Sequence, residues 1–260
     1  MPFRLLLLLL LGAFPLLGCA AGAQNGFFGS ALVRESYPRV CMQANSPLTL
    51  QGYGRQWVSF ETPSLVSQAS GRMDFAVYGE GERGPVNRHA HVFVARPHDE
   101  RHWYFQPESY PAPGGLSIGS REISGSRWVT QILRVVGEQD WFSAMWRESG
   151  REVPLLWLAR RFSASPDRAI RIVAEYREAW PECLDPEIAD LQFIPSSCME
   201  GFLARSDAAF TLEINGPINK EMLKEPPPAS LLVKPASVPD MKRLAGELTE
   251  ADWEFFRMWR

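Results

Sequence analysis

The chain has 260 residues, of which 45% are hydrophobic and 22% charged, and its formal net charge is −3. This length and hydrophobic fraction suit one sizeable folded domain with a short appendage, and they exclude a chain that is disordered throughout. The near-neutral charge balance provides no electrostatic footprint for nucleic acid, so nucleic-acid binding is not expected.

The first residues have the organisation of a secretory signal. Arg4 precedes an apolar stretch over residues 5–17, which is too short to remain in a bilayer as a spanning helix. The stretch ends in the sequence Leu-Leu-Gly-Cys at residues 16–19, which resembles the lipobox of bacterial lipoproteins. The resemblance implies a lipoprotein signal peptide over residues 1–18 and a diacylglycerol and palmitate anchor on Cys19.

The same resemblance implies a location for the protein. Ala20 stands where lipoproteins retained in the inner membrane usually carry aspartate, so an outer-membrane anchor that faces the periplasm is expected. An A-x-A cleavage pattern at residues 21–23 is the alternative, and it would release a soluble periplasmic protein.

Three cysteines follow Cys19, and an oxidising compartment would allow two of them to pair. Cys183 and Cys198 are 15 positions apart, and we predict that they form a disulfide that leaves Cys41 as a single thiol. Closing a loop of that length stabilises a fold by about 3 kcal/mol. The alternative is three reduced, buried cysteines that act as small apolar residues.

The strand patterns lie in the first two thirds of the chain. Residues 19–40 are weakly patterned, which predicts a tether, and a folded domain is expected over residues 41–215. Short runs of β-branched and aromatic residues predict strands, and the absence of crossover helices between them predicts an antiparallel sheet. Along residues 170–177 apolar and charged residues alternate, which predicts one dry face and one largely solvent-exposed face.

Helical patterns come later in the chain. They cover residues 140–148, a segment that begins at Asp185 and Pro186, and residues 197–210. This order indicates an α+β fold, with an antiparallel sheet of about six to eight strands and the late helices on one face.

The C-terminal part differs in composition. Prolines mark residues 216–248 as a stiff linker, and residues 249–260 have the pattern of an aromatic helix. Trp253, Phe256 and Trp259 fall near one side of that helix, where they could bind another envelope protein by helix-in-groove docking. The alternative is that the helix folds back onto its own domain, because aromatic side chains this dense are rarely left exposed.

Two motifs have the letters of catalytic signatures but not their context. Residues 79–84 match G-x-G-x-x-G, yet a strand follows them instead of a phosphate-binding helix, so a hairpin turn is predicted. Residues 115–119 match G-x-S-x-G, but no histidine occurs after His102, as the usual order of a hydrolase triad requires.

All four histidines lie within fourteen residues, at His89, His91, His98 and His102. His89 and His91 have strand spacing and share a face, so together they could bind a metal ion. A hairpin over residues 97–100, pairing residues 90–95 with 102–105, would leave His102 too far away to share that ion. The alternative is a solvated histidine face.

Carboxylates gather between Glu175 and Asp190, where a solvated strand edge and a helix start are the simpler interpretation. The sequence therefore predicts a lipid-anchored envelope protein with a non-catalytic binding or assembly role and no cofactor. A periplasm-facing hydrolase that uses carboxylates or a histidine-bound metal is the alternative. As a whole the chain resembles small lipoproteins of Desulfovibrio-like bacteria, which implies no activity.

Overall fold

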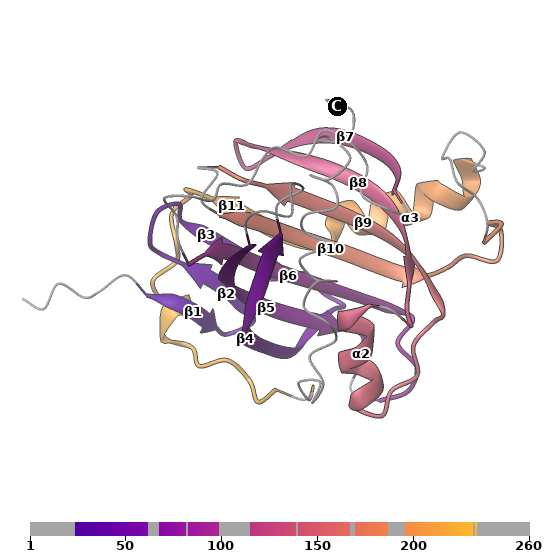
Figure 1. Cartoon of the computed structure of the whole chain (residues 1–260), viewed down its shortest axis with the longest axis horizontal. Helices are drawn as coiled ribbons and strands as arrows, with labels where there is room; N and C mark the ends of the chain where they lie inside the picture. The colour runs from indigo at the N-terminus through magenta and orange to yellow at the C-terminus, as the bar shows by residue number, and fades with distance from the viewer. Residues whose placement is uncertain are drawn as a thin grey trace, which may run out of the picture.

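The computed structural model describes residues 24–61, 68–81, 83–98, 115–138, 140–166, 170–186, 196–230 and 232. In these ranges the chain forms two antiparallel sheets, two α-helices and one short 3₁₀-helix (Figure 1). None of the helices described is both long and apolar enough to cross a membrane. The predicted α+β class with an antiparallel sheet is confirmed.

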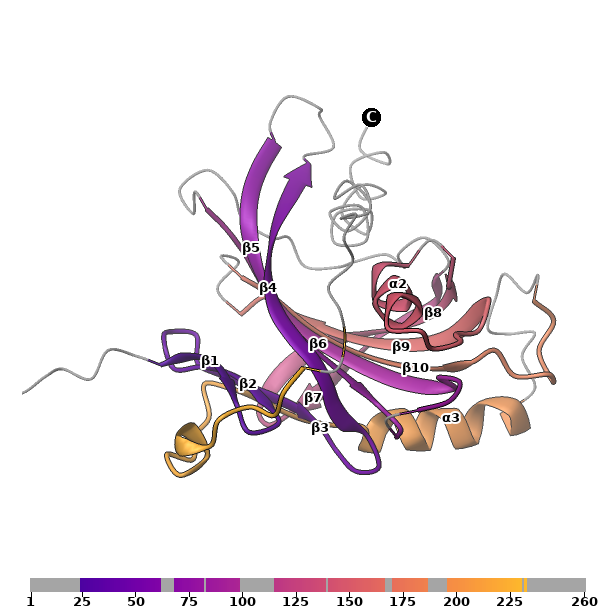
Figure 2. The same cartoon turned by 90° about the horizontal axis from the view of Figure 1, so that it is seen from below.

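The larger sheet has seven strands in the order β4-β5-β6-β10-β9-β8-β7, a number within the expected range. In Figure 2 the sheet is strongly curved, and β4 and β5 bend away from the other strands. β9 and β10 follow one another in the chain and pair as antiparallel neighbours. The strands are β4 (Thr49–Glu61), β5 (Gln68–Gly79), β6 (Arg88–Pro97), β7 (Gly115–Ile123), β8 (Ser126–Val136), β9 (Leu156–Ala164) and β10 (Arg171–Ala179).

The smaller sheet has four strands in the order β1-β2-β3-β11. Its strands are β1 (Asn25–Phe28), β2 (Ala31–Arg34), β3 (Val40–Ala44) and β11 (Phe210–Ile214). The tether predicted over residues 19–40 therefore contains two strands, so residues before 41 belong to the folded domain. These strands are short and lack a long alternating pattern, which explains why the sequence did not reveal them.

The two helices lie on opposite faces of the larger sheet, in place of the single face expected (Figure 2). Helix α3 (Ser196–Ala208) and the smaller sheet share one apolar core, which contains Met199, Phe202 and Met42. Helix α2 (Trp141–Glu148) packs on the other face through Trp141, Phe142, Met145 and Trp146. Both faces of the central strands are consequently buried.

Two predicted elements near these strands need correction. β6 pairs with β5 on one side and β10 on the other, so the hairpin between residues 90–95 and 102–105 is wrong. The helix predicted over residues 197–210 ends at Ala208, because Phe210 begins β11. The G-x-G-x-x-G segment joins β5 to β6, and Ser117 of G-x-S-x-G lies within strand β7, so neither motif precedes a helix.

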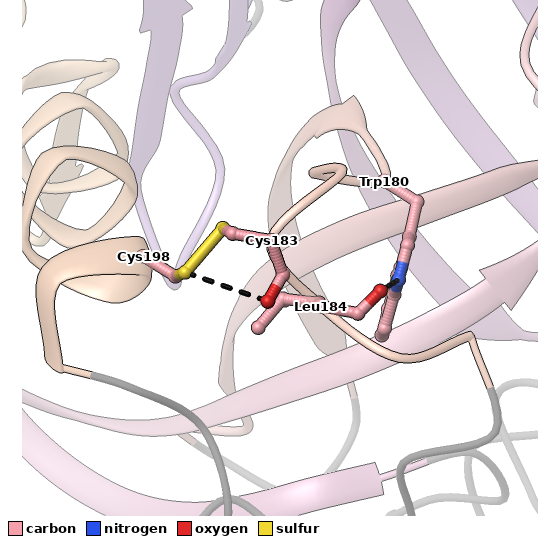
Figure 3. The surroundings of a disulfide bond; sticks show 4 residues. All are labelled: Trp180, Cys183, Leu184 and Cys198. Atoms are coloured by element: carbon pink, nitrogen blue, oxygen red, sulfur yellow. Dashed lines mark hydrogen bonds between the residues drawn. A yellow bond between two sulfur atoms is a disulfide. The ribbon is translucent and has the colours of Figure 1, made fainter.

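The predicted disulfide joins Cys183 to Cys198 in the first turn of α3 (Figure 3). Nearby, the Trp180 indole N–H donates to the Leu184 carbonyl oxygen at 3.1 Å, which closes the loop that contains Cys183. Cys41 is the free thiol of the described chain, and burial beside Glu213 raises its pKa to about 11. Cys41 is therefore protonated and unreactive at neutral pH.

The proline-rich region is not a detached linker along its whole length. A 3₁₀-helix, η3 (Met222–Lys224), is followed by Glu225, whose carbonyl oxygen accepts the Gly29 N–H at 2.9 Å. Leu232 then donates its N–H to Gln51 on β4 and is buried in the same core as helix α2. A Cβ on Gly52 would lie 2.8 Å from the Leu232 Cβ, so a glycine is needed at this crossing.

Candidate functional site

The centre of the larger sheet carries polar side chains on the face that α2 covers. His91 on β6, Glu175 on β10, Arg161 on β9 and Gln131 on β8 are cross-strand neighbours in one row. None of the four is more than 8% exposed. Side chains alternate between the two faces of a strand. The polar residues of this row therefore point to the α2 face, and their apolar neighbours in the sequence point to the core on the opposite face.

Glu175 is the central member of this row and is 0% exposed. Its carboxylate accepts one hydrogen bond from Arg161 Nε and another from Arg177 Nε, each at 2.5 Å. Two arginines facing one carboxylate would leave an excess positive charge in the interior, which is costly without a second anion.

Asp140 supplies that second anion and joins the row to helix α2. It is the N-cap of α2, and its Oδ2 accepts the Ser143 backbone N–H at 2.6 Å. The same oxygen lies 2.6 Å from Arg177 Nη1. The Ser143 hydroxyl in turn accepts the Trp157 indole N–H at 3.0 Å. The first turn of α2 is thus held to the sheet by one ion pair and one neutral hydrogen bond.

His89 lies against the C-terminal half of helix α2, where it contacts Trp146. Its ring stacks on Trp157 with centroids 4.6 Å apart, and its Nδ1 accepts the Trp146 indole N–H at 2.7 Å. The proton of the neutral ring is therefore on Nε2, which has no hydrogen-bond partner among the described residues. Gly79 makes this approach possible, because a Cβ there would lie 2.6 Å from the Trp146 ring.

His91 occupies the next position along the same face. Its ring stacks on Phe142 with centroids 3.6 Å apart and an interplanar angle of 15°. Its Nε2 lies 3.9 Å from Glu175 Oε1, beyond hydrogen-bond range. Both histidine rings are therefore packed against aromatic rings, His89 against Trp146 and Trp157 and His91 against Phe142.

The electrostatics of the cluster fix each group in one protonation state. Burial, reinforced by Arg177, lowers the pKa of His89 well below its usual range, and burial is the main cause for His91 as well. For Glu175 burial acts in the opposite direction and raises the pKa, but Arg161 and Arg177 outweigh it and the net pKa is lowered. At neutral pH the histidines are therefore neutral and the carboxylate is ionised.

This arrangement has little capacity for acid–base chemistry. A general acid at neutral pH needs a carboxyl pKa raised toward 7, whereas the pKa of Glu175 is shifted the other way. His89 and His91 are 0% and 1% exposed, so a substrate would have to displace α2 to reach them. The contacts instead join three strands to one helix.

The structure brings His89 and His91 together on one face, as their spacing predicts, but the face is buried and not solvated. Across the described ranges no three His, Cys, Asp or Glu side chains gather as a metal would require. His98 is exposed at the end of β6 and takes no part in the cluster. His102, Cys19, Trp253, Phe256 and Trp259 lie outside the described residues.

The interpretation of the carboxylates as a solvated strand edge is wrong for two of them. Glu175 is in the buried cluster, and Glu178, which is 8% exposed, lies on the opposite face of β10. There Glu178 accepts hydrogen bonds from Arg205 of α3 at 2.5 and 2.7 Å and from the Tyr176 hydroxyl. Glu182 and Asp185 are exposed, as expected.

The arginines and Asp140 are the members of the cluster that sequence reasoning missed. Arg161, Glu175 and Arg177 are charged residues inside apolar strands, and opposite charges two positions apart on one face are a recognisable signal for a buried pair. Their burial could not be inferred without knowing that α2 returns to this face.

Comparison of the chain with protein-family models, with curated proteins and with solved structures finds no significant match.

Proposed function

We propose that the protein is a lipid-anchored component of the cell envelope, attached through Cys19, and that it has a binding or assembly role without catalysis. The lipobox at residues 16–19 supports the anchor, with the outer membrane as its location. The C-terminal aromatic segment, with Trp253, Phe256 and Trp259, is the part that we assign to an envelope partner.

The observation that carries the non-catalytic role is the state of the buried cluster. Glu175, the carboxylate opposite His91 in the row, is neutralised by two arginines and closed to solvent. Such a cluster holds a helix on a sheet and offers no ionisable group for substrate chemistry. This state of the cluster supports a role in binding through other surfaces.

The anchor is tested by changing Cys19→Ser in the full chain, expressed in a Gram-negative host with labelled palmitate. We expect the parent protein to carry the label and to fractionate with the outer membrane, and the variant to lose the label completely. Cys41→Ser is the matched control and should remain labelled. Labelling of the Cys19→Ser variant, or a soluble parent protein that begins at Gln24, would contradict the proposed anchor.

The binding role is tested by ending the chain after Lys234. Leu232, the last described residue, stays in this variant, so its contacts in the α2 core are kept and the domain should unfold at the parent's urea midpoint. Crosslinking in intact cells should capture an envelope protein with the parent chain and lose it, by tenfold or more, with the truncated one. A truncated chain that fails to fold would instead place the aromatic segment in the domain's own core.

The competing function is a hydrolase with a metal held by His89 and His91. Measured metal content decides between the two. Stoichiometric zinc or copper in the purified protein, lost on His89→Ala and His91→Ala, would favour the hydrolase and overturn the binding proposal.

A further inference from the structure

A group of arginines lies on the outer end of the larger sheet, on the face that the smaller sheet partly covers. Arg55, Arg72 and Arg96 come from three adjacent strands, β4, β5 and β6. Arg34, at the end of β2, lines a small pocket together with Arg96 and Asp74. These four arginines, with the exposed aromatic residues Tyr37 and Trp57, are called the basic patch below.

The register explains why the charges gather. Trp57, Arg72 and Arg96 are cross-strand neighbours in one row, and Arg55 and Asp74 are neighbours in the next. Arg72 and Arg96 are thus placed directly opposite each other, an arrangement that destabilises an isolated sheet. Asp74 compensates only in part, because one of its oxygens serves both Arg55 at 2.5 Å and Arg72 at 3.4 Å.

The charge excess is local. Arg34 and Arg96 line the pocket together with Asp74, and the same Asp74 carboxylate also contacts Arg55 and Arg72. The whole chain has a formal net charge of −3, so this positive surface opposes the overall balance. Such a surface favours an anionic partner.

Two aromatic side chains border the arginines and are unusually open. Trp57 is 60% exposed and Tyr37 is 71% exposed, although most of the described large apolar residues are buried. Tyr37 is fixed next to the patch because Arg34 Nη2 donates to its carbonyl oxygen at 3.0 Å. Arginine with exposed Trp and Tyr is the composition of surfaces that rest in the headgroup region of a bilayer.

The short sequence distance between Cys19 and the patch favours the membrane as the partner. Asn25, the first residue of β1, lines the same pocket as Arg34 and Arg96. Cys19 is only six residues before Asn25, and six residues span at most about 22 Å when fully extended. An acyl chain on Cys19 would therefore hold the pocket close to the bilayer surface.

We propose that the basic patch docks the domain on the anionic phosphate headgroups of the membrane into which the Cys19 lipid inserts. The inference rests on the proposed anchor for its geometry. The arginines supply charge attraction to the phosphates, while Trp57 and Tyr37 lie at the headgroup level. The lipid would then fix where the protein is, and the patch would fix which face it turns to the membrane.

Vesicle binding tests the patch separately from the anchor. The mature chain, residues 19–260, is produced with Cys19→Ser so that no acyl chain contributes, and is sedimented with vesicles of phosphatidylglycerol and phosphatidylcholine at 3:7. We expect binding that is lost at high salt and is absent with pure phosphatidylcholine. Arg72→Gln with Arg96→Gln should weaken it by about 25-fold, or about fivefold for each arginine.

Matched variants make the result specific. Arg83→Gln with Arg127→Gln removes two exposed arginines elsewhere and should leave binding within about twofold. Arg72→Lys with Arg96→Lys keeps the charge and should keep most of the binding. Equal losses in the patch variant and the Arg83/Arg127 variant, or equal binding to both vesicle types, would overturn the patch.

Two further outcomes separate the proposals. Competition of vesicle binding by millimolar inorganic phosphate would assign the patch to a soluble anion and overturn the membrane assignment. If Cys19 is not acylated and the vesicle result still holds, only the proposed anchor fails. If Cys19 is acylated and the patch variant binds normally, only this inference fails.

Discussion

Replacement of Glu175 by glutamine is expected to lower the free energy of unfolding by about 3–5 kcal/mol, because it leaves two buried arginines without their shared carboxylate. Glu175 accepts from Arg161 and Arg177 at 2.5 Å each and is fully buried, so no solvent can replace the lost charge. Urea unfolding followed by tryptophan fluorescence measures the change.

Two comparisons show whether the loss comes from the cluster. Glu182→Gln changes an exposed carboxylate a few residues away and should alter stability by no more than about 0.5 kcal/mol. In the double variant Glu175→Gln with Arg161→Gln, the loss of stability should be smaller than the sum of the losses in the two single variants, since the partners interact directly. Additive losses would mean that the two side chains are independent, contrary to the contacts described.

Acidification from pH 7 to pH 5.5 is expected to lower the free energy of unfolding by about 2.5 kcal/mol through His89 and His91. The folded pKa of each histidine is lowered by burial, whereas the unfolded chain regains the ordinary value of 6.5. Below that value the unfolded state binds more protons, so stability is complete above pH 6.5 and is lost as the pH falls. Glu175 and Asp140, whose pKa values are also lowered, stay ionised over this window.

Urea unfolding at a series of pH values tests this loss. His91→Phe keeps a flat ring against Phe142 but removes one proton site, so the fall between pH 7 and 5.5 should be halved. His98→Gln changes an exposed histidine and should leave the fall as it is in the parent. A parent protein whose stability is constant over this range would rule out buried neutral histidines.

Local sequence patterns predicted the parts of the fold that depend on local rules. The helix predicted over residues 140–148 corresponds to α2, which begins after its N-cap Asp140 and packs through an apolar side. The alternation along residues 170–177 likewise predicts strand β10, and the spacing of Cys183 and Cys198 predicts their bridge. In each case the signal and the structure it specifies lie within about twenty residues.

The site was predicted only in part, because its burial depends on distant segments. The spacing of His89 and His91 correctly placed both on one face. Whether that face is wet depends on α2, whose Trp146 reaches His89 from 57 positions away in the chain. From the sequence alone the charged alternation in β10 predicts solvent exposure, since an arginine that neutralises a buried glutamate has the same sequence pattern as an arginine in water.

The path of the chain after Glu225 has a consequence for how the protein could act as a bridge. The first strand belongs to the smaller sheet, on the α3 side, whereas Leu232 lies in the α2 core on the other side. The prolines at residues 226–228 favour a stiff, extended backbone between these two sides, with a rise of about 3.1 Å per residue. A membrane held at one end and a partner held at the other would pull on opposite sides of the same sheet. If both proposed attachments hold, the larger sheet would set the distance between them.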